Sequence, residues 1–179
     1  MNTKTKKITV IAMLSAAAGI LMLMEFPIPI FPSFLEIDFS DLPALLGSFL
    51  ISPVAGVVIV FLKIVINLLF TGTATGFIGE AANFVIGVSF VIPAGLIYQN
   101  NKTKRGAVTG MLFGILSMAV IGGFANYFVL IPLFIKGMPA NELSKLVIYS
   151  IIPFNILKGT MSSILAFLLY KRLSHFFNR

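Results

Sequence analysis

Long apolar runs dominate this sequence and decide its fold class. Runs of about 17 to 25 apolar residues are long enough to cross the hydrocarbon core of a bilayer. Five candidates occur, at residues 8–24, 54–70, 77–98, 107–134 and 147–170. With 58% hydrophobic and 11% charged residues, the 179-residue chain is too apolar for a soluble protein. We therefore predict an all-α membrane protein with one integral membrane domain over residues 1–179.

A shorter apolar stretch at residues 42–51 adds a sixth expected helix. It follows the sequence Ser-Asp-Leu-Pro at 40–43, in which a proline suits the first helical turn, and it ends at Ser52-Pro53. The stretch is either a half-span or a helix whose start lies inside the preceding loop. Counting it predicts a bundle of six transmembrane helices.

The positions of the basic residues test the predicted number of transmembrane helices. Nine of them flank the first, third, fourth and last long stretches: Lys4, Lys6, Lys7, Lys102, Lys104, Arg105, Lys171, Arg172 and Arg179. Six helices place all nine on one side of the membrane and leave only Lys136 and Lys145 on the other. The positive-inside rule then predicts that both termini are cytoplasmic. Since no basic face exists outside these flanks, we expect no nucleic-acid partner.

The segment from 25 to 41 is expected on the outer side and has an unusual composition. Three prolines prevent a regular helix, and four phenylalanines make the segment too apolar for a solvated linker. These residues are Pro27, Pro29, Pro32, Phe26, Phe31, Phe34 and Phe39. The segment is either seated among lipid headgroups or forms a lid over an outward-facing pocket, since its length and apolarity suit both.

Four groups of polar residues interrupt the apolar stretches. A charged side chain at mid-membrane costs roughly 2.5 to 3.5 kcal/mol, so it normally faces a protein interior or a wet cavity. The groups are Lys63 with Asn67, Glu80 with Asn83, Asn126 alone, and Asn155 with Lys158. Counting along the helices places most of these groups at a shared depth in the outer half of the membrane.

Three interpretations fit the polar groups. They could be structural contacts in which Lys63 or Lys158 neutralises Glu80, they could relay protons or ions, or they could bind a small molecule. A cation site would be expected to have more carboxylates and fewer amines. Amides offer donors and acceptors to a neutral ligand, and abundant Phe and Leu could enclose its apolar rings. We favour a small-molecule site.

Catalysis finds little support in the sequence. The single histidine, His175, lies in a basic tail, there is no cysteine, and no His/Asp/Glu cluster has the spacing of metal ligands. The glycine-rich stretch 71–76 lacks the Gly-Lys-Ser/Thr ending of a phosphate-binding loop and is expected to be a turn on the outer side. We expect neither an enzyme nor a bound metal.

Four short strings resemble the riboflavin-specific substrate-binding (S) components of energy-coupling factor (ECF) vitamin transporters. They are Asp-Phe-Ser-Asp-Leu-Pro-Ala-Leu at 38–45, Gly-Glu-Ala-Ala-Asn-Phe at 79–84, Ala-Asn-Tyr-Phe at 125–128 and Pro-Phe-Asn-Ile-Leu-Lys-Gly at 153–159. Six expected helices and the small residues Ala12 and Ala16 extend the resemblance over nearly the whole chain.

The resemblance implies a function and a set of partners. An S component binds one vitamin near the outer face of a prokaryotic cell membrane, beneath the loop after its first helix. It has no ATPase of its own, and joins a transmembrane coupling protein and two ATP-binding cassette ATPases. Riboflavin would be the transported ligand, with no cofactor. S components for thiamine, biotin or a similar vitamin, and a self-sufficient secondary carrier, remain alternatives.

The resemblance also implies roles for individual residues. The expected ligand-binding residues are Phe39, Leu42, Glu80, Asn83, Asn126, Asn155 and Lys158. Of these, Asn155 and Lys158 would donate to ring carbonyls or ribityl oxygens, and Phe39 and Leu42 would cover the ring. Lys63 and Asn67 would support Glu80 or line a deeper route. Ala12 and Ala16 would contact the coupling protein.

Overall fold

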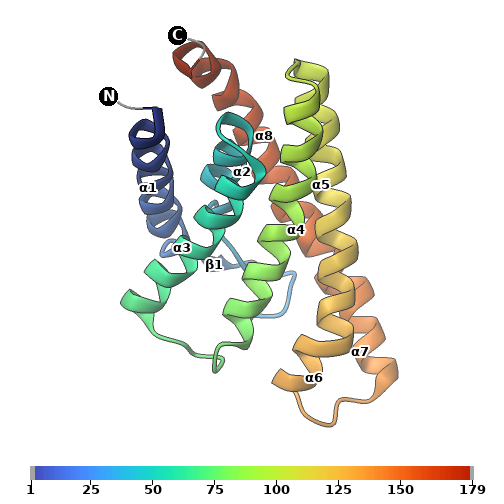
Figure 1. Cartoon of the computed structure of the whole chain (residues 1–179). Helices are drawn as coiled ribbons and strands as arrows, with labels where there is room; N and C mark the ends of the chain where they lie inside the picture. Colours follow the sequence, from blue (N-terminus) through green and yellow to red (C-terminus); the bar gives the residue numbers. More distant parts are fainter. Residues whose placement is uncertain (1–2, 178–179) are drawn as a thin grey trace.

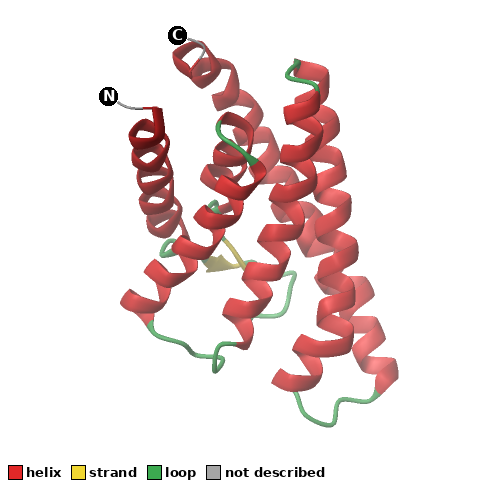
Figure 2. Cartoon of the chain, viewed as in Figure 1, coloured by secondary structure: helices red, strands yellow, loops and turns green. Residues whose placement is uncertain are grey.

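The computed structural model describes the backbone of residues 3–177 and the side chains of residues 4–169. Its helices are α1 (Thr3–Met22), α2 (Asp41–Leu50), α3 (Pro53–Thr71), α4 (Ile78–Asn100), α5 (Lys104–Ala125), α6 (Ile131–Phe134), α7 (Ala140–Leu146) and α8 (Ile152–Phe177). Two π-helical segments, η1 (Asn126–Leu130) and η2 (Val147–Ile151), join α5 to α6 and α7 to α8. Figure 1 shows these elements in order along the bundle, and Figure 2 shows how little of the chain is not helical.

Over the described residues the helical segments form six rods, which confirms the predicted bundle. Five rods are long and apolar enough to cross a membrane. The sixth, α2, has ten residues and so extends about 15 Å, half of a bilayer's hydrocarbon thickness. Of the two possibilities for this stretch, the structure shows the half-span. Its first residues therefore lie inside the bundle.

The short length of α2 brings the preceding segment into the bundle as well. Strands β1 (Phe26–Pro27) and β2 (Glu36–Ile37) pair antiparallel, with Phe26 opposite Ile37. The resulting hairpin lies between the helices rather than beyond their ends (Figure 1). Irregular backbone at membrane depth is tolerated where it is buried in protein or lines a cavity. Ile37, Asp38 and Ser40 are accordingly buried.

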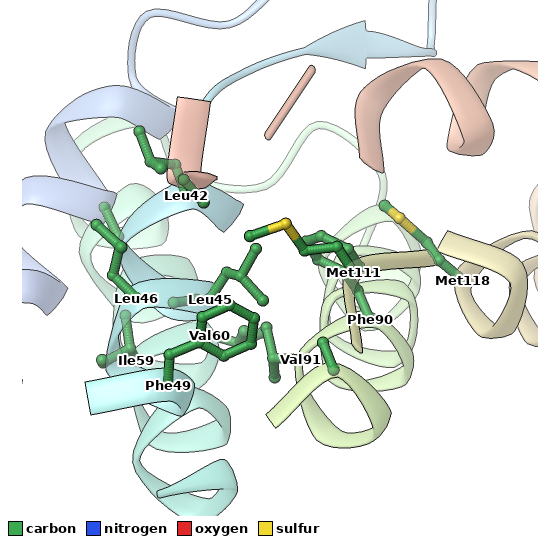
Figure 3. Packing of buried hydrophobic residues seen from close by; sticks show 14 of the residues in the cluster. Leu42, Leu45, Leu46, Phe49, Ile59, Val60, Phe90, Val91, Met111 and Met118 are labelled. Carbon is green, nitrogen blue, oxygen red and sulfur yellow. The ribbon is translucent and has the colours of Figure 1, made fainter. Parts of the chain in front are cut away.

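The hydrophobic core surrounds α2. Leu45 and Phe49 of α2 are buried against Ile59 of α3 and Phe90 of α4, as Figure 3 shows. The Phe49 ring stacks on Tyr98, with ring centroids 4.5 Å apart. A helix that is apolar on nearly all sides suits this central place, and nine of its ten residues are buried.

Helices α4 and α5 pack closely because α5 presents glycines along one ridge. A Cβ atom added at Gly110 would lie 2.6 Å from the carbonyl oxygen of Ala94, and one at Gly114 would lie 2.8 Å from that of Phe90. Small residues four apart let two membrane helices approach to backbone contact. The two helices therefore form one closely packed wall of the bundle.

The ends of the bundle differ in charge. The start of α1, the end of α8 and the turn between α4 and α5 lie at one end (Figure 1), which therefore carries Lys4, Lys6 and Lys7 together with the basic residues of that turn. Loops 72–77 and 135–139 lie at the opposite end. The predicted positions of Lys171, Arg172, His175 and Arg179 concern side chains outside the described residues.

Candidate functional site: a lidded polar cavity

A cavity lies between the hairpin segment and the helices α4, η1, α6 and α8. Its empty volume is about 750 Å³, which includes space open to solvent at its mouth. Most of its lining is apolar, and a few polar side chains interrupt it. The polar lining residues are Glu36, Thr75, Asn83, Asn126, Asn155 and Lys158.

The segment between α1 and α2 forms one wall of this cavity, through Phe34, Leu35 and Glu36. Aromatic contacts attach the segment to the helices around it. The Phe31 ring meets Phe154 of α8 edge-on, with centroids 5.4 Å apart, and the Phe34 ring lies 6.0 Å from that of Phe134 in α6. Of the two interpretations of this segment, the structure supports the lid, and we call residues 25–40 the lid.

An ion pair connects the lid to α8. The Lys158 Nζ atom donates to Asp38 Oδ2 at 2.6 Å, and Asp38 Oδ1 accepts from the Ser40 backbone N–H at 2.6 Å. Burial disfavours the Asp38 carboxylate, but the ammonium groups of Lys158 and Lys63 outweigh this effect and lower the pKa of Asp38. Asp38 is therefore a buried anion at the base of the lid.

A second ion pair connects the start of α2 to α3. The Lys63 Nζ atom donates to Asp41 Oδ1 at 2.5 Å and to Ser40 Oγ at 2.6 Å. Lys63 and Asp41 are both buried and neither lines the cavity. The alternative in which Lys63 or Lys158 neutralises Glu80 is not what the structure shows: Lys63 pairs with Asp41, and Lys158 pairs with Asp38. The sequence contained a signal for them, since two aspartates closely precede a helix and two lysines interrupt apolar spans.

The structure brings together four of the predicted ligand-binding residues. Asn83 of α4, Asn126 of η1, and Asn155 and Lys158 of α8 all line the cavity. The other three do not: the Glu80 carboxylate accepts from the Thr75 hydroxyl at 3.0 Å, Phe39 is half-buried, and Leu42 packs in the hydrophobic core. Lid residues Phe34 and Leu35 stand at the cavity where Phe39 and Leu42 were expected.

The remaining predicted residues lie away from the cavity. Asn67 is buried, and its Oδ1 accepts from the Thr71 hydroxyl at 3.1 Å. Lys63 bonds to Asp41 and Ser40, as described. Ala12 and Ala16 are exposed on the outer face of α1.

Two asparagines of the cavity differ in what they can offer a ligand. The Asn126 Nδ2 atom donates one of its two N–H groups to the Gly122 carbonyl at 2.8 Å, which leaves the amide oxygen and the second N–H for a ligand. Asn155 is 2% exposed, and its Nδ2 atom has no hydrogen-bond partner among the described residues. A Cβ atom added at Gly122 would lie 2.7 Å from Asn155 Nδ2, so this glycine provides the space for the amide. A buried donor without a partner suits a site that a ligand completes.

Glu25 lies at the start of the lid, just before β1, and the strand register places it beside Asp38. Burial raises its pKa to about 7, helped by repulsion from Glu36 and Asp38 and opposed by the charges of Lys158 and Lys63. A carboxyl group whose pKa is raised by folding stabilises the folded state less as the pH rises from its ordinary pKa through the raised value.

We therefore expect the thermal stability of the protein to fall relative to that of Glu25→Gln as the pH rises from about 4 to about 8. The two proteins should melt alike at the lower pH, where Glu25 is protonated and resembles glutamine. Thermal unfolding in mild detergent across this range measures the difference. Parallel curves for the two proteins would contradict the burial of Glu25 against Glu36 and Asp38.

The cavity's chemistry favours binding over reaction. Three amides, the Thr75 hydroxyl, the Lys158 ammonium group and the Glu36 carboxylate interrupt an apolar lining, so both signs of charge are present and the set suits a neutral molecule with ring carbonyls or hydroxyls. Over the described residues, no group of three His, Cys, Asp or Glu side chains could hold a metal ion.

Comparisons with known proteins agree with this picture. Residues 6–170 match the family described as "ECF transporter, substrate-specific component". The riboflavin transporter RibU of Staphylococcus aureus (strain TCH60) is 40% identical over 98% of this chain and 94% of its own length. The riboflavin transporter FmnP of Bacillus subtilis (strain 168) is 31% identical over 95% of this chain and 93% of its own. A solved structure of the S component of a bacterial ECF transporter superposes with a TM-score of 0.84 at 38% identity, covering 99% of this chain and 100% of that one.

Proposed function

Because this chain belongs to the family of substrate-specific components of ECF transporters, we propose that it binds riboflavin and delivers it across the membrane as the substrate-binding subunit of an ATP-driven transporter. Two relatives that match this chain over nearly its full length are riboflavin transporters. The alternatives, another vitamin or a self-sufficient carrier, have no comparable support.

The observation that carries the proposal is the set of amides in the lidded cavity. Riboflavin has a flat apolar ring system with a uracil-like edge, and a hydroxylated ribityl tail. The unpartnered Asn155 Nδ2 atom supplies a donor, the Asn126 amide oxygen supplies an acceptor, and the apolar lining suits the rings. Ring carbonyls and ribityl hydroxyls complement both kinds of group.

The proposed roles of the site residues follow from these positions. Asn155 and Lys158 donate to the ligand, and Asn83 and Asn126 complete the polar contacts. Glu80 acts from the rim through its bond to Thr75, which lines the cavity. Phe34 and Leu35 of the lid cover the apolar part of the ligand in place of Phe39 and Leu42.

The proposed orientation puts the basic end of the bundle in the cytoplasm of a prokaryotic cell. The cavity includes Thr75 and Ile78, next to the loop at the opposite end, so it then faces outward. The exposed Ala12 and Ala16 on α1 offer a close-packing face to a coupling protein, which would connect this subunit to two ATP-binding cassette ATPases.

Purification in mild detergent tests the proposed ligand. The protein should copurify with a flavin or, once emptied, quench the fluorescence of added riboflavin with saturation at one molecule per chain. A well-folded protein that neither copurifies with a flavin nor quenches riboflavin would contradict the proposal. Competition with thiamine and biotin separates riboflavin from other vitamins, since neither should displace it.

Reconstitution in liposomes separates this function from that of a self-sufficient carrier. The purified chain alone should bind riboflavin without accumulating it inside the vesicles. Accumulation driven by an ion gradient, with no ATPase present, would favour the secondary carrier instead.

A further inference from the structure

We propose that Asp38 is a positioning residue for the ligand: it holds the Lys158 ammonium group at the cavity wall, and so makes the lid part of the binding chemistry. This inference rests on the proposed binding of riboflavin. Asp38 itself does not line the cavity, and its effect on the ligand passes through Lys158.

Lys158 needs such a partner. A lysine has a flexible stem and three donors that can rotate, so an unrestrained ammonium group loses entropy when it meets a ligand. In the structure one donor is fixed to Asp38 Oδ2 at 2.6 Å, and Lys158 is only 6% exposed. The other two donors remain available to a ligand. Asp38 thus orients the ammonium group before the ligand arrives.

Asp38 is itself well placed to do this. Its second carboxylate oxygen accepts from the Ser40 backbone N–H at 2.6 Å, so both oxygens are bonded and the side chain is fully buried. The pair is neutral as a whole, which lets a cation line an apolar cavity without requiring a charged ligand. This agrees with riboflavin, whose ring system and ribityl tail are uncharged.

The Asp38–Lys158 ion pair also makes the orientation of the ammonium group depend on the lid. Asp38 belongs to the lid, whereas Lys158 lies 120 residues away on α8. The oriented ammonium group therefore exists only while the base of the lid is seated. A ligand that bonds to Lys158 in this orientation stabilises the seated lid in turn.

A double-mutant cycle tests the proposal through riboflavin affinity. Fluorescence quenching is measured for the parent, Asp38→Asn, Lys158→Met and the double variant, each as its monodisperse fraction in detergent. We expect each single variant to bind about tenfold or more weakly, because one charge-assisted contact is lost or misplaced. The double variant should bind about as weakly as Lys158→Met alone, because Asp38 acts through Lys158. Unchanged affinity in Asp38→Asn, or losses that multiply in the double variant, would overturn the proposal.

Two further variants separate positioning from general stability. Asp38→Glu keeps the charge and should bind more tightly than Asp38→Asn; equal weakness would overturn the proposal. If Asp38→Asn does not fold, Asp38→Glu replaces it in the double-mutant cycle. Asp41→Asn removes a carboxylate that is equally buried and paired with a lysine away from the cavity, while the Asp38–Lys158 bond stays in place. Its folded fraction should bind within about threefold of the parent, and a loss as large as that of Asp38→Asn would overturn the proposal. A parent protein that does not bind riboflavin would instead overturn the proposed function.

Discussion

Replacing Lys63 by Met is expected to lower the free energy of unfolding by about 3–5 kcal/mol, which is the usual loss when one partner of a buried ion pair is removed. Lys63 and Asp41 are buried to 0% and 1% exposure, and their charged atoms lie 2.5 Å apart. Without the ammonium group, Asp41 is left as an uncompensated anion between α2 and α3. Because α2 is the centre of the hydrophobic core, its displacement would loosen the whole bundle. Unfolding of the detergent-solubilised protein in increasing fractions of SDS measures the loss.

The matched control removes both charges. Lys63→Met combined with Asp41→Leu should recover most of the lost stability, because two apolar side chains replace a pair whose desolvation offsets much of its attraction. A double variant as unstable as Lys63→Met would show that specific hydrogen bonds, including the one from Lys63 to Ser40, matter more than the uncompensated charge. A stable Lys63→Met variant would contradict the burial of this pair.

Replacing Asn155 by Leu is expected to weaken riboflavin binding by about 1.5–3 kcal/mol, or roughly ten- to a hundredfold, while leaving the stability of the empty protein unchanged or raised. Riboflavin affinity and the stability of the empty protein change in opposite directions for one reason. The Asn155 Nδ2 atom has no partner among the described residues when the cavity is empty, so its removal loses no protein hydrogen bond and relieves a buried unpaired donor. With the ligand bound, the same removal leaves a ligand acceptor without its donor. Fluorescence titration and thermal unfolding measure the two effects separately.

Ser162 offers a matched control on the same helix. It is fully buried and its hydroxyl also has no partner among the described residues, but it does not line the cavity. Ser162→Ala should leave riboflavin affinity as it is in the parent. Equal losses of affinity in both variants would mean that the Asn155 effect comes from the packing of α8 and not from the ligand.

The helical rods were predictable because a bilayer demands long apolar stretches. The position of α2 was predictable from its proline start, but the sequence left open whether it is a half-span. The asparagines of the site were predictable for a similar reason. A polar side chain such as Asn155 inside an apolar span must face something other than lipid. Three helices that each carry such a residue therefore converge on one cavity.

The partners of the lysines were harder to predict. Asp38 and Asp41 lie in the segment 25–41, which the sequence predicts to be a loop on the outer side. The carboxylates of these two residues were therefore expected near the membrane surface. The structure places that segment inside the bundle, because α2 spans only half the membrane and the chain must reach its start. Pairing between Asp38 and Lys158 spans 120 residues. No local pattern specifies a contact of that range, and packing of the whole bundle decides it.

The two π-helical segments on either side of the cavity carry a consequence for how the chain tolerates insertions and deletions. A π-helical turn holds one residue more than an α-helical turn, and such turns often occur at functional sites. A π-helical turn absorbs its additional residue, so deleting one residue from η2 would leave a regular α-helix with α7 and α8 in nearly the same relative orientation. Deleting one residue from the first turn of α8, before Asn155, would instead rotate the rest of that helix by about 100°. Asn155 and Lys158 would then leave the cavity, or the packing of Leu143 and Val147 with Ile131 and Ile151 would be lost. A change of one residue in length is therefore expected to be tolerated in η2 but not in the first turn of α8.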